Sequence, residues 1–595
     1  MINKLKHLKH VRILLLIAFV GINKLGSTQY MEFEWSDKYR FTNKKTGFFS
    51  EYIGTSHTSI YLLQRNISKS KPYDNAKLML VALNKNTVAH DTMIPLKGFP
   101  ENKSAEKTLN SLDYLTSIVS EEQVIVFWRK LINTDSTRKE EIYAQTFKSN
   151  LKKGLSLKKV FETTQEVESQ ESIFDPSMCV VISEEESEHF VIGTEYFKNG
   201  EIKFQYITLN YELSPSILKT ISLPQKLINN PKQITSTYDL LRNGHLCIRS
   251  SVKYTNKELD ELPLKHSKSF LSLTVANIKT AEHCVVKMQG ENKTITDYSY
   301  ENVGDRTRVI GFFGDLSKDT TGIDKQGLFY ADIDNLTLSK TDVKFVYFDR
   351  STVNRLFPKK RMKKRMKESP SQEEILQTRF DIEHIEVMPD SSIVLFSTLE
   401  YNQDIKSSRS NMKGENVYAT NSFFKKRDID AIRFSNDGEI MWARSLERKA
   451  KYEGVDLMDV RVVYKYNKFI VIYGNDDAEL KPPKQKKKYK HLTEELEYAT
   501  FDPKSGRAKT YTTPVNEPKT DKKDKRYLDP NSAVVIDDKF YFHKMTVCQN
   551  PLWTAANVVC FPTIYYSVLS GNTKLGKGDF TMMRIMEGKR PRRKK

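Results

Sequence analysis

The stretch Arg433–Leu446, "RFSNDGEIMWARSL", holds the pattern that decides the fold. An alternating run of apolar and polar residues ends at Phe434, and the turn Asn436–Gly438 follows it. Asn, Asp and Gly tolerate the positive φ of a tight hairpin turn, so the stretch predicts a strand, a turn and a second strand. Trp442 falls on the second strand, where we expect it to pack between neighbouring sheets.

The same kind of run recurs along the chain. The other runs end at Leu83, Phe147, Leu209, Ala276, Ile333, Phe501 and Leu569. Successive end residues are 64, 62, 67, 57, 101, 67 and 68 positions apart, and the long interval contains a charged insertion. The remaining intervals lie near one period, which is typical of a repeat fold.

Further strands surround each of these runs. Apolar runs such as "SIYLLQ" and "KFIVIYGN" precede them, runs such as "MCVVISE" come earlier still, and runs such as "TMIPLK" follow the turn. They are rich in Val, Ile, Tyr and Phe and are bounded by Asn, Asp, Gly and Pro. Four short antiparallel strands per repeat predict an all-β chain that forms a single β-propeller, most simply of eight four-stranded blades. Two β-sandwiches are the alternative, but their strands would not repeat in fours at one period.

The last repeat is irregular. Its third strand is expected at "YYSVLSGN", which ends near Leu569, and its fourth strand after the connection "GNTKLGKGDF". If this repeat does not form a blade, the count falls to seven. Two strands within Tyr30–Thr42 are available to close the ring against it. A short helix is expected only in the basic insertion Arg355–Thr378.

Three families resemble parts of this pattern. The opening stretch resembles the Asp-box of sialidases, but Gly438 directly follows Asp437, and the box is itself a structural turn. Quinoprotein dehydrogenases are similar in blade count, but this chain has only four Trp and no adjacent Cys pair. Phrases such as "GFFGDLSKDTTGIDKQGLFYADID" (Gly311–Asp334) are similar to repeats of uncharacterised exported bacterial propeller-type proteins. That resemblance implies a fold and an export route, and it carries no catalytic residue.

The N-terminal residues resemble an export signal. Residues 1–28 hold a basic segment, the short apolar run Ile13–Ile22 and small residues before Gln29. The apolar run is too short to span a bilayer, so we expect a cleaved signal peptide and a mature chain without a transmembrane segment. The propeller is then assigned to residues 29–587 and a basic disordered tail to 588–595, in a protein that is periplasmic, outer-surface or secreted.

The charge of the chain is concentrated in its insertions. The formal net charge is +20, and basic insertions lie near 351–378, 403–428 and 481–493. The candidate residues for an anionic partner are Lys359, Lys360, Arg361, Lys363, Lys364, Arg365, Lys367, Lys484, Lys486, Lys487, Lys488 and Lys490. Turns after first and third strands are short, whereas connections after second and fourth strands are long, so we expect all long loops on one face. Tyr489 is the one aromatic residue within these two runs, which argues against specific nucleic-acid binding.

Motifs for catalysis or metal binding are missing from the sequence. There is no Gly-x-Ser-x-Gly elbow, His-Glu-x-x-His or Cys-x-x-Cys, and Asp315–Asp324 has Thr320 where a calcium loop needs Gly. We therefore expect no metal and no cofactor. Three of the five cysteines lie in or near apolar runs and are expected to be buried thiols: Cys179, Cys247 and Cys284. Cys548 and Cys560 are a candidate disulfide, with free thiols as the alternative.

Together these features indicate an exported propeller that serves as a binding scaffold in a bacterial cell envelope. Its partner would be an unknown protein or an anionic polysaccharide. One alternative is a glycan-active enzyme, a hydrolase or lyase, with its site on the long-loop face. Another is a binder of anionic polymer or membrane surface through basic loops. A converging group of buried carboxylates or arginines in the mouth of the central channel would favour the enzyme.

Overall fold

The computed structural model of this 595-residue chain describes most of the repeat region. The described residues are 30–35, 39–40, 49–65, 78–87, 90–96, 109, 111–120, 122–134, 137–152, 157–166, 179–183, 188–198, 201–223, 234–253, 269–288, 293–315, 326–356, 379–410, 416–447, 460–473, 495–514, 527–528, 534–536, 539–545 and 578–588. The predicted signal peptide, both basic runs and the pair Cys548 and Cys560 lie outside these residues.

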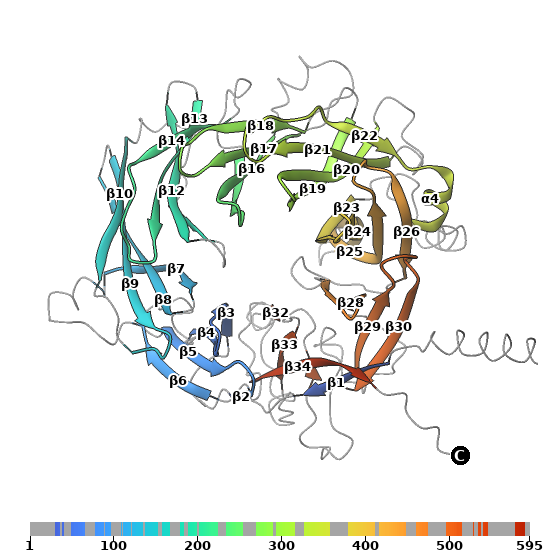
Figure 1. Ribbon diagram of the computed structural model, residues 1–595, viewed down its shortest axis with the longest axis horizontal. Coiled ribbons are helices and arrows are strands. Elements are labelled where there is room, and N and C mark those ends of the chain that lie inside the picture. The colour runs from blue at the N-terminus through green and yellow to red at the C-terminus, as the bar shows by residue number, and fades with distance from the viewer. Residues whose placement is uncertain are drawn as a thin grey trace, which may run out of the picture.

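Within the described residues the strands form eight antiparallel sheets arranged in a ring (Figure 1). Seven sheets have four strands, and the eighth has six because two short strands are added to it. Each four-stranded sheet is a meander of consecutive strands, with its first strand toward the ring centre and its fourth at the outside (Figure 1). This is the predicted all-β propeller, and its blades are numbered here in chain order.

In each of the first four blades, four consecutive strands pair in chain order. Blade 1 is β3 (Phe49–Thr55), β4 (Ser59–Arg65), β5 (Leu78–Asn84) and β6 (His90–Pro95). Blade 2 is β7 (Asp113–Val119), β8 (Gln123–Asn133), β9 (Thr137–Lys148) and β10 (Lys158–Glu166). Blade 3 is β11 (Val180–Ile182), β12 (His189–Lys198), β13 (Glu201–Asn210) and β14 (Lys219–Ser222). Blade 4 is β15 (Ile234–Leu240), β16 (His245–Lys253), β17 (Ser269–Asn277) and β18 (His283–Lys287).

The remaining blades complete the ring. Blade 5 is β19 (Lys293–Val303), β20 (Arg306–Asp315), β21 (Gln326–Asp334) and β22 (Lys344–Tyr347). Blade 6 is β23 (Arg379–Val387), β24 (Ile393–Ser410), β25 (Asn416–Phe434) and β26 (Ile440–Leu446). Blade 7 is β27 (Arg461–Lys465), β28 (Lys468–Tyr473), β29 (Glu495–Phe501) and β30 (Ala508–Pro514). Blade 8 is β31 (Tyr527–Leu528), β32 (Val534–Ile536), β33 (Lys539–Met545) and β34 (Gly578–Gly588), joined by β1 (Tyr30–Trp35) and β2 (Tyr39–Arg40).

Blade 8 is built from both ends of the chain. β1 pairs antiparallel with β34, from Tyr30 opposite Gly588 to Trp35 opposite Met583. The strand after "GNTKLGKGDF" is therefore the third strand of the blade, and its prediction as the fourth was wrong. The fourth place is taken by β1, because pairing with it hydrogen-bonds an edge that the C-terminal segment alone leaves open. Leu569 lies outside the described residues, and β34 runs to Gly588, one residue into the predicted tail.

The recurring run ends define the third strands. The seven that fall on described residues, from Leu83 to Phe501, lie on third strands as predicted, each at the last or next-to-last position, and they are 0–1% exposed. In five blades the next residue is Asn84, Asn210, Asn277, Asp334 or Asp502, whose side-chain oxygen accepts two backbone N–H hydrogen bonds of the turn. This Asx turn ends the strand and starts the hairpin, since the side chain replaces ladder partners that the backbone lacks there.

The opening stretch forms the turn between β25 and β26, as predicted. Gly438 has φ +86°, and a Cβ there would lie 2.1 Å from a ring carbon of Tyr330 in blade 5. The Tyr330 hydroxyl donates to the Asp437 carbonyl at 2.6 Å. Trp442 of blade 6 contacts the corresponding turn of blade 7 in the same way. Its ring lies against Gly506, and its indole N–H donates to the Pro503 carbonyl at 2.9 Å.

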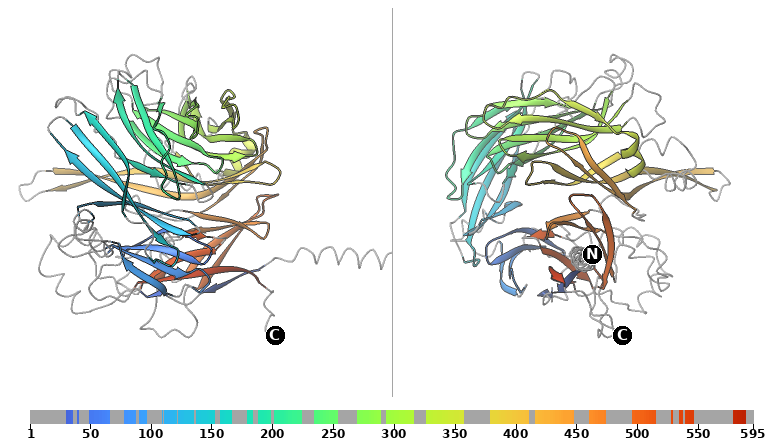
Figure 2. Two further views of the ribbon diagram at one scale, coloured as in Figure 1. Left: turned by 60° about the vertical axis from the view of Figure 1, so that its left-hand side comes forward. Right: turned by 45° about the vertical axis from the view of Figure 1, so that its right-hand side comes forward.

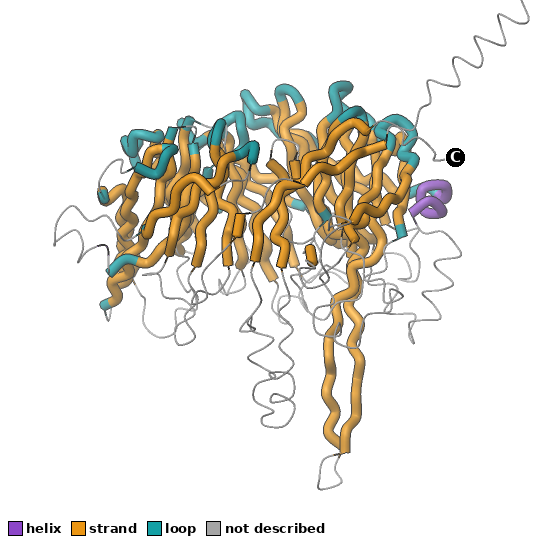
Figure 3. The backbone as a smooth tube through the Cα atoms, turned by 90° about the horizontal axis from the view of Figure 1, so that it is seen from below, coloured by secondary structure: helices purple, strands orange, loops and turns teal. Residues whose placement is uncertain are grey.

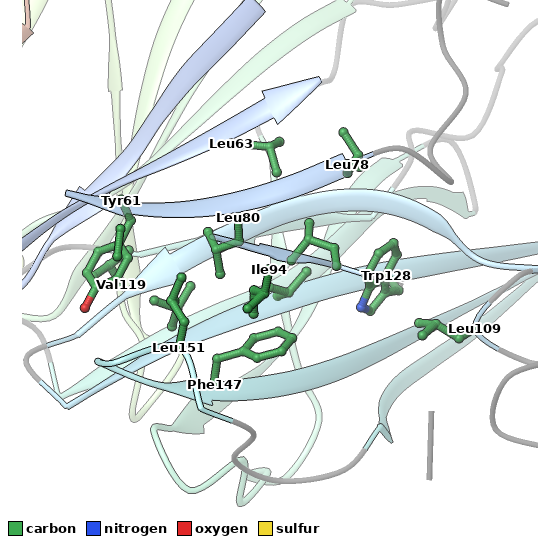
Figure 4. Packing of buried hydrophobic residues seen from close by; sticks show 14 of the residues in the cluster. Tyr61, Leu63, Leu78, Leu80, Ile94, Leu109, Val119, Trp128, Phe147 and Leu151 are labelled. Carbon is green, nitrogen blue, oxygen red and sulfur yellow. The ribbon is translucent and has the colours of Figure 1, made fainter. Parts of the chain in front are cut away.

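The hydrophobic core lies between the blades. Six clusters each combine residues of two neighbouring blades, from the pair of blades 1 and 2 to the pair of blades 6 and 7. In the first of these, Tyr61 and Leu80 of blade 1 meet Trp128 and Phe147 of blade 2 (Figure 4). Blades 2 to 6 thus bury both faces, which explains the near-continuous apolar runs in their second and third strands.

Among the described residues the helix is α4 (Arg350–Leu356), which packs near β26. It begins five residues before the predicted helical insertion, because Asp349 is its N-cap residue. The Asp349 carboxylate accepts the backbone N–H of Thr352 at 2.7 Å, an N-cap hydrogen bond. The basic run that follows α4 lies outside the described residues.

The Gly438 turn gives a stability test. Gly438→Ala should lower the free energy of unfolding by about 2–4 kcal/mol, because it combines a left-handed backbone with overlap on the Tyr330 ring. Gly244→Ala is the matched control, since Gly244 has φ +78° with nothing within 4 Å of a Cβ. It should cost only about 1 kcal/mol, from backbone strain alone. Urea unfolding measures both, and equal losses would contradict the proposed contact between the turn and the tyrosine.

Candidate functional site

The two faces of the ring differ in their connections. Turns after first and third strands are short, such as Tyr466–Asn467 between β27 and β28, and they gather on one face (Figure 3). Connections after second and fourth strands leave from the opposite face, here called the long-loop face. The predicted segregation follows from this meander topology, except that 134–136, 199–200 and 288–292 are short connections on the long-loop face, and 149–157 and 335–343 are the longest on the other.

A two-stranded ribbon projects from the long-loop face (Figures 2 and 3). It is the outer part of β24 and β25, which pair from Glu400 opposite Lys426 to Ser410 opposite Asn416. β23 pairs with β24 only as far as Glu400, and β26 pairs with β25 only as far as Ile429. The insertion expected near 403–428 is therefore a β-ribbon whose edges pair with no other described strand, and its interpretation as a loop was wrong.

The predicted basic residues lie in two connections between described elements. The run Lys359–Lys367 belongs to the connection from α4 to β23, and the run Lys481–Lys490 to the connection from β28 to β29. The first connection follows β22, a fourth strand, with α4 between them, and the second follows β28, a second strand. The residues themselves lie outside the described part of the chain, so their role stays a prediction.

A polar cluster lies between the first two strands of blade 4 and the first strand of blade 5. Arg249 of β16 places its guanidinium 4.6 Å from the ring centre of Tyr298 and 5.6 Å from that of Tyr300, both on β19. Its N–H nitrogen lies 3.9 Å from the carboxylate of Asp297. The Tyr300 hydroxyl donates a short hydrogen bond to Asp239 of β15. The cluster thus combines an arginine with two carboxylates, the residue types expected of an enzyme site, at a junction between two blades.

The hydrogen bonds of Asp297 indicate a different role. One carboxylate oxygen accepts the backbone N–H of Ile382 in blade 6 at 2.8 Å, and the other accepts the backbone N–H of Tyr298 at 2.8 Å. A bulge between Ile295 and Asp297 turns this residue toward the neighbouring blade. Burial raises the pKa of the Asp297 carboxyl, and nearby Asp381 adds to this, while the N–H of Ile382 and Arg249 oppose it.

A carboxylate of one blade contacts the next blade at five successive junctions, and at three of them it accepts a backbone N–H. Glu140 of blade 2 accepts the backbone N–H of Cys179 with both oxygens at 3.1 Å. Glu195 of blade 3 interacts with Ser236 and Tyr238 of blade 4, and burial raises its pKa. After Asp239 and Asp297, a carboxylate oxygen of Glu383 in blade 6 accepts the backbone N–H of Val460 at 3.4 Å. These carboxylates, here called inner latches, each reach the next blade along the chain.

A second set of hydrogen bonds joins the blades at the short-turn face. A side chain of one blade donates to a turn carbonyl of the next blade, and these outer latches are Tyr61 to Ser149, Gln123 to Tyr211, Tyr206 to Ile278, Tyr330 to Asp437 and Trp442 to Pro503. Their donor–acceptor distances run from 2.5 to 3.4 Å. The ring is thus tied at two levels, and Trp442 packs between blades as predicted.

Three of the cysteines were predicted to be buried thiols. Cys179 and Cys247 are buried free thiols, as predicted, whereas Cys284 is only partly buried. Burial raises the pKa of all three thiols, so they are poor nucleophiles. Over the described ranges there is no group of three or more His, Cys, Asp or Glu arranged to hold a metal. No helix in that part of the chain is long and apolar enough to cross a membrane.

Sequence reasoning missed the inner latches. The motif "DYSYE" at Asp297–Glu301 carries the bulge position and the two tyrosines, but alternation alone does not reveal which blade each side faces. The feature that marks Asp297 is the register shift beside it in a first strand, and a register shift cannot be seen in the sequence alone.

The fold and its junctions define a β-propeller of eight sheets closed by its N-terminal strand. No protein-family model and no curated protein sequence matches the chain. Solved structures with similar folds include the β-propeller domain of the Trilobed protease from Pyrococcus furiosus, 10% identical, covering 80% of this chain and 98% of that chain with a TM-score of 0.31. The WD40 domain of SCAP from fission yeast is 7% identical, covering 93% and 98% with a TM-score of 0.32. These likenesses carry no argument about activity, and the fold assignment rests on the sheet topology.

The inner latches give a pH test. Because the folded pKa of Asp297 is raised above its ordinary value of 3.8, the wild-type chain loses stability relative to Asp297→Asn as pH rises through the window above 3.8. Asp334→Asn is the control of opposite sign. Backbone N–H and hydroxyl hydrogen bonds from Thr337 lower the pKa of Asp334, so its contribution is present above 3.8 and is lost as pH falls through the folded pKa. Urea unfolding between about pH 3 and pH 7 measures both slopes, and slopes of the same sign would contradict this assignment.

Proposed function

We propose that this protein is an exported propeller that binds an anionic partner through its long-loop face. The observation that carries the proposal is the asymmetry of the ring, with short turns on one face and the β24–β25 ribbon on the other (Figure 3). Loops and extensions on a rigid scaffold are where proteins place recognition. Inner and outer latches make this ring such a scaffold.

The charge of the chain supports an anionic partner. Seven of the nine residues in Lys359–Lys367 and six of the ten in Lys481–Lys490 are cationic, and neither run contains an acid. Both runs lie in connections that follow a fourth or a second strand, which we expect on the long-loop face. Their summed field would attract an anionic polysaccharide, lipid headgroup or acidic protein surface.

The inner latches support binding over catalysis. A glycan-active enzyme needs carboxyl groups that are open to substrate on both the acid and the base side. The carboxylates of Glu140, Asp297 and Glu383 instead accept backbone N–H groups of the next blade. Their burial is thus explained by ring assembly, and the binding scaffold remains the simpler function.

Export through the N-terminal segment is part of this proposal. β1 begins at Tyr30, one residue after the expected cleavage before Gln29. Removal of residues 1–28 would therefore leave the closing strand of blade 8 intact. N-terminal sequencing of the protein from an exporting bacterial host tests this, with Gln29 as the expected first residue and an uncleaved Met1 in the exported fraction as the contrary result.

The basic run before β23 gives the binding test. Replacing Lys359, Lys360, Arg361, Lys363 and Lys364 by Ser should weaken binding to heparin and to anionic vesicles and flatten its salt dependence, because each lost phosphate-like contact removes a slope of about 0.9 or less in log K against log salt. Thermal stability should change little, since exposed charges contribute little to folding. A matched control replaces Lys85, Lys148, Lys152, Lys279 and Lys504, which lie in or next to short turns of the opposite face. Equal binding by both variants and the wild type would contradict the proposal.

A further inference from the structure

An aromatic box surrounds one lysine at the long-loop edge of blade 5. The ammonium of Lys293, the first residue of β19, lies 5.4, 5.5 and 5.0 Å from the ring centres of Phe313, Phe345 and Tyr347. It also donates to the Tyr347 hydroxyl at 2.6 Å. All three rings are therefore within the distance at which a cation is attracted by an aromatic face.

The rings are arranged as walls. Phe313 stands almost perpendicular to both others, at 81° to Phe345 with centres 5.0 Å apart and at 79° to Tyr347 with centres 5.1 Å apart. Phe313 is 1% exposed and forms the deep wall, whereas Tyr347 is 39% exposed and forms the outer one. The box thus has a closed end within the blade and an open side toward solvent.

Gly327 makes this arrangement sterically possible. It is paired with Phe313 on one side and Tyr347 on the other. A Cβ at Gly327 would lie 2.7 Å from a ring carbon of Phe313 and 2.1 Å from the Val346 carbonyl. Without a side chain between them, two rings from strands that are not neighbours can meet. The box is therefore a feature of the blade's register and does not depend on the surrounding loops.

We propose that Phe313, Phe345 and Tyr347 form a binding site for a quaternary ammonium group, which Lys293 occupies as a built-in competitor. Aromatic faces attract a trimethylammonium group without needing hydrogen-bond acceptors, which such a group cannot use. A ligand enters by displacing Lys293 through the open side. The site takes a cation, so it is independent of the proposed anionic recognition by the basic loops.

Titration calorimetry with choline chloride tests the site on the full chain. Lys293→Ala and Lys293→Gln should each bind choline at least tenfold more tightly than the wild type, because the competitor is gone. Adding Tyr347→Ala to either should abolish the gain. Lys344→Ala is the matched control, since Lys344 lies 5.5 Å from a single ring, that of Tyr330, and its removal should produce no gain.

Two further measurements complete the test. In the wild-type chain, saturating tetramethylammonium should speed acetylation of Lys293 by an activated ester and leave Lys344 unchanged, as read by mass spectrometry against equal sodium chloride. Phosphatidylcholine vesicles identify the source, because binding to them assigns a lipid headgroup and binding of choline alone assigns a soluble ligand. Unchanged labelling of Lys293, together with choline affinities of the Lys293 variants that equal the wild type or the Lys344 variant, overturns the proposal.

Discussion

Each blade of this propeller can bury its two faces only against the blades on either side, and that constraint governs the rest of the structure. The described core consists of six clusters that each span a junction between two blades. A repeat with two apolar faces is unstable alone and gains its stability from neighbouring repeats. A ring satisfies all blades at once, so closing blade 8 with β1 is a condition of the whole fold.

Hydrophobic burial does not by itself fix the angle between two blades, because apolar contact is non-directional. The inner and outer latches add direction. Glu140 and Asp297 satisfy backbone N–H groups at the start or middle of the next inner strand, where no further strand can pair with them. An unpaired buried N–H costs about 1–3 kcal/mol, so each latch offsets a cost that the inner edge would otherwise carry. The raised pKa of Asp297 records the opposing cost of burying its carboxylate.

Features of this structure that depend on neighbouring residues could be predicted from the sequence, whereas features that depend on contacts between distant segments could not. The ends of third strands were predictable, because an apolar residue followed by an Asx turn, as at Leu209 and Asn210, is a local signal. The strands within Tyr30–Thr42 close the ring as the sequence allowed, but the C-terminal strand was expected as the fourth of the blade and is the third, because β1 takes the fourth place. The ribbon was interpreted as a loop because its charged and polar residues mask its strand pairing. The inner latches were not predictable, since the bulge beside Asp297 and the blade it faces are set by tertiary packing.

Closure of blade 8 by the N-terminal strand is the feature on which the whole ring depends. Glu34 of β1 lies opposite Arg584 of β34, whereas Gly588 pairs four positions away with Tyr30. In the double variant Glu34→Cys/Arg584→Cys, mild oxidation should give a disulfide-linked peptide pair by mass spectrometry and raise the urea midpoint of unfolding, because opposite positions in an antiparallel pair have the spacing that a disulfide needs. The variant Glu34→Cys/Gly588→Cys should not cross-link. Cross-linking of the second pair but not the first, or of neither, would contradict closure in this register.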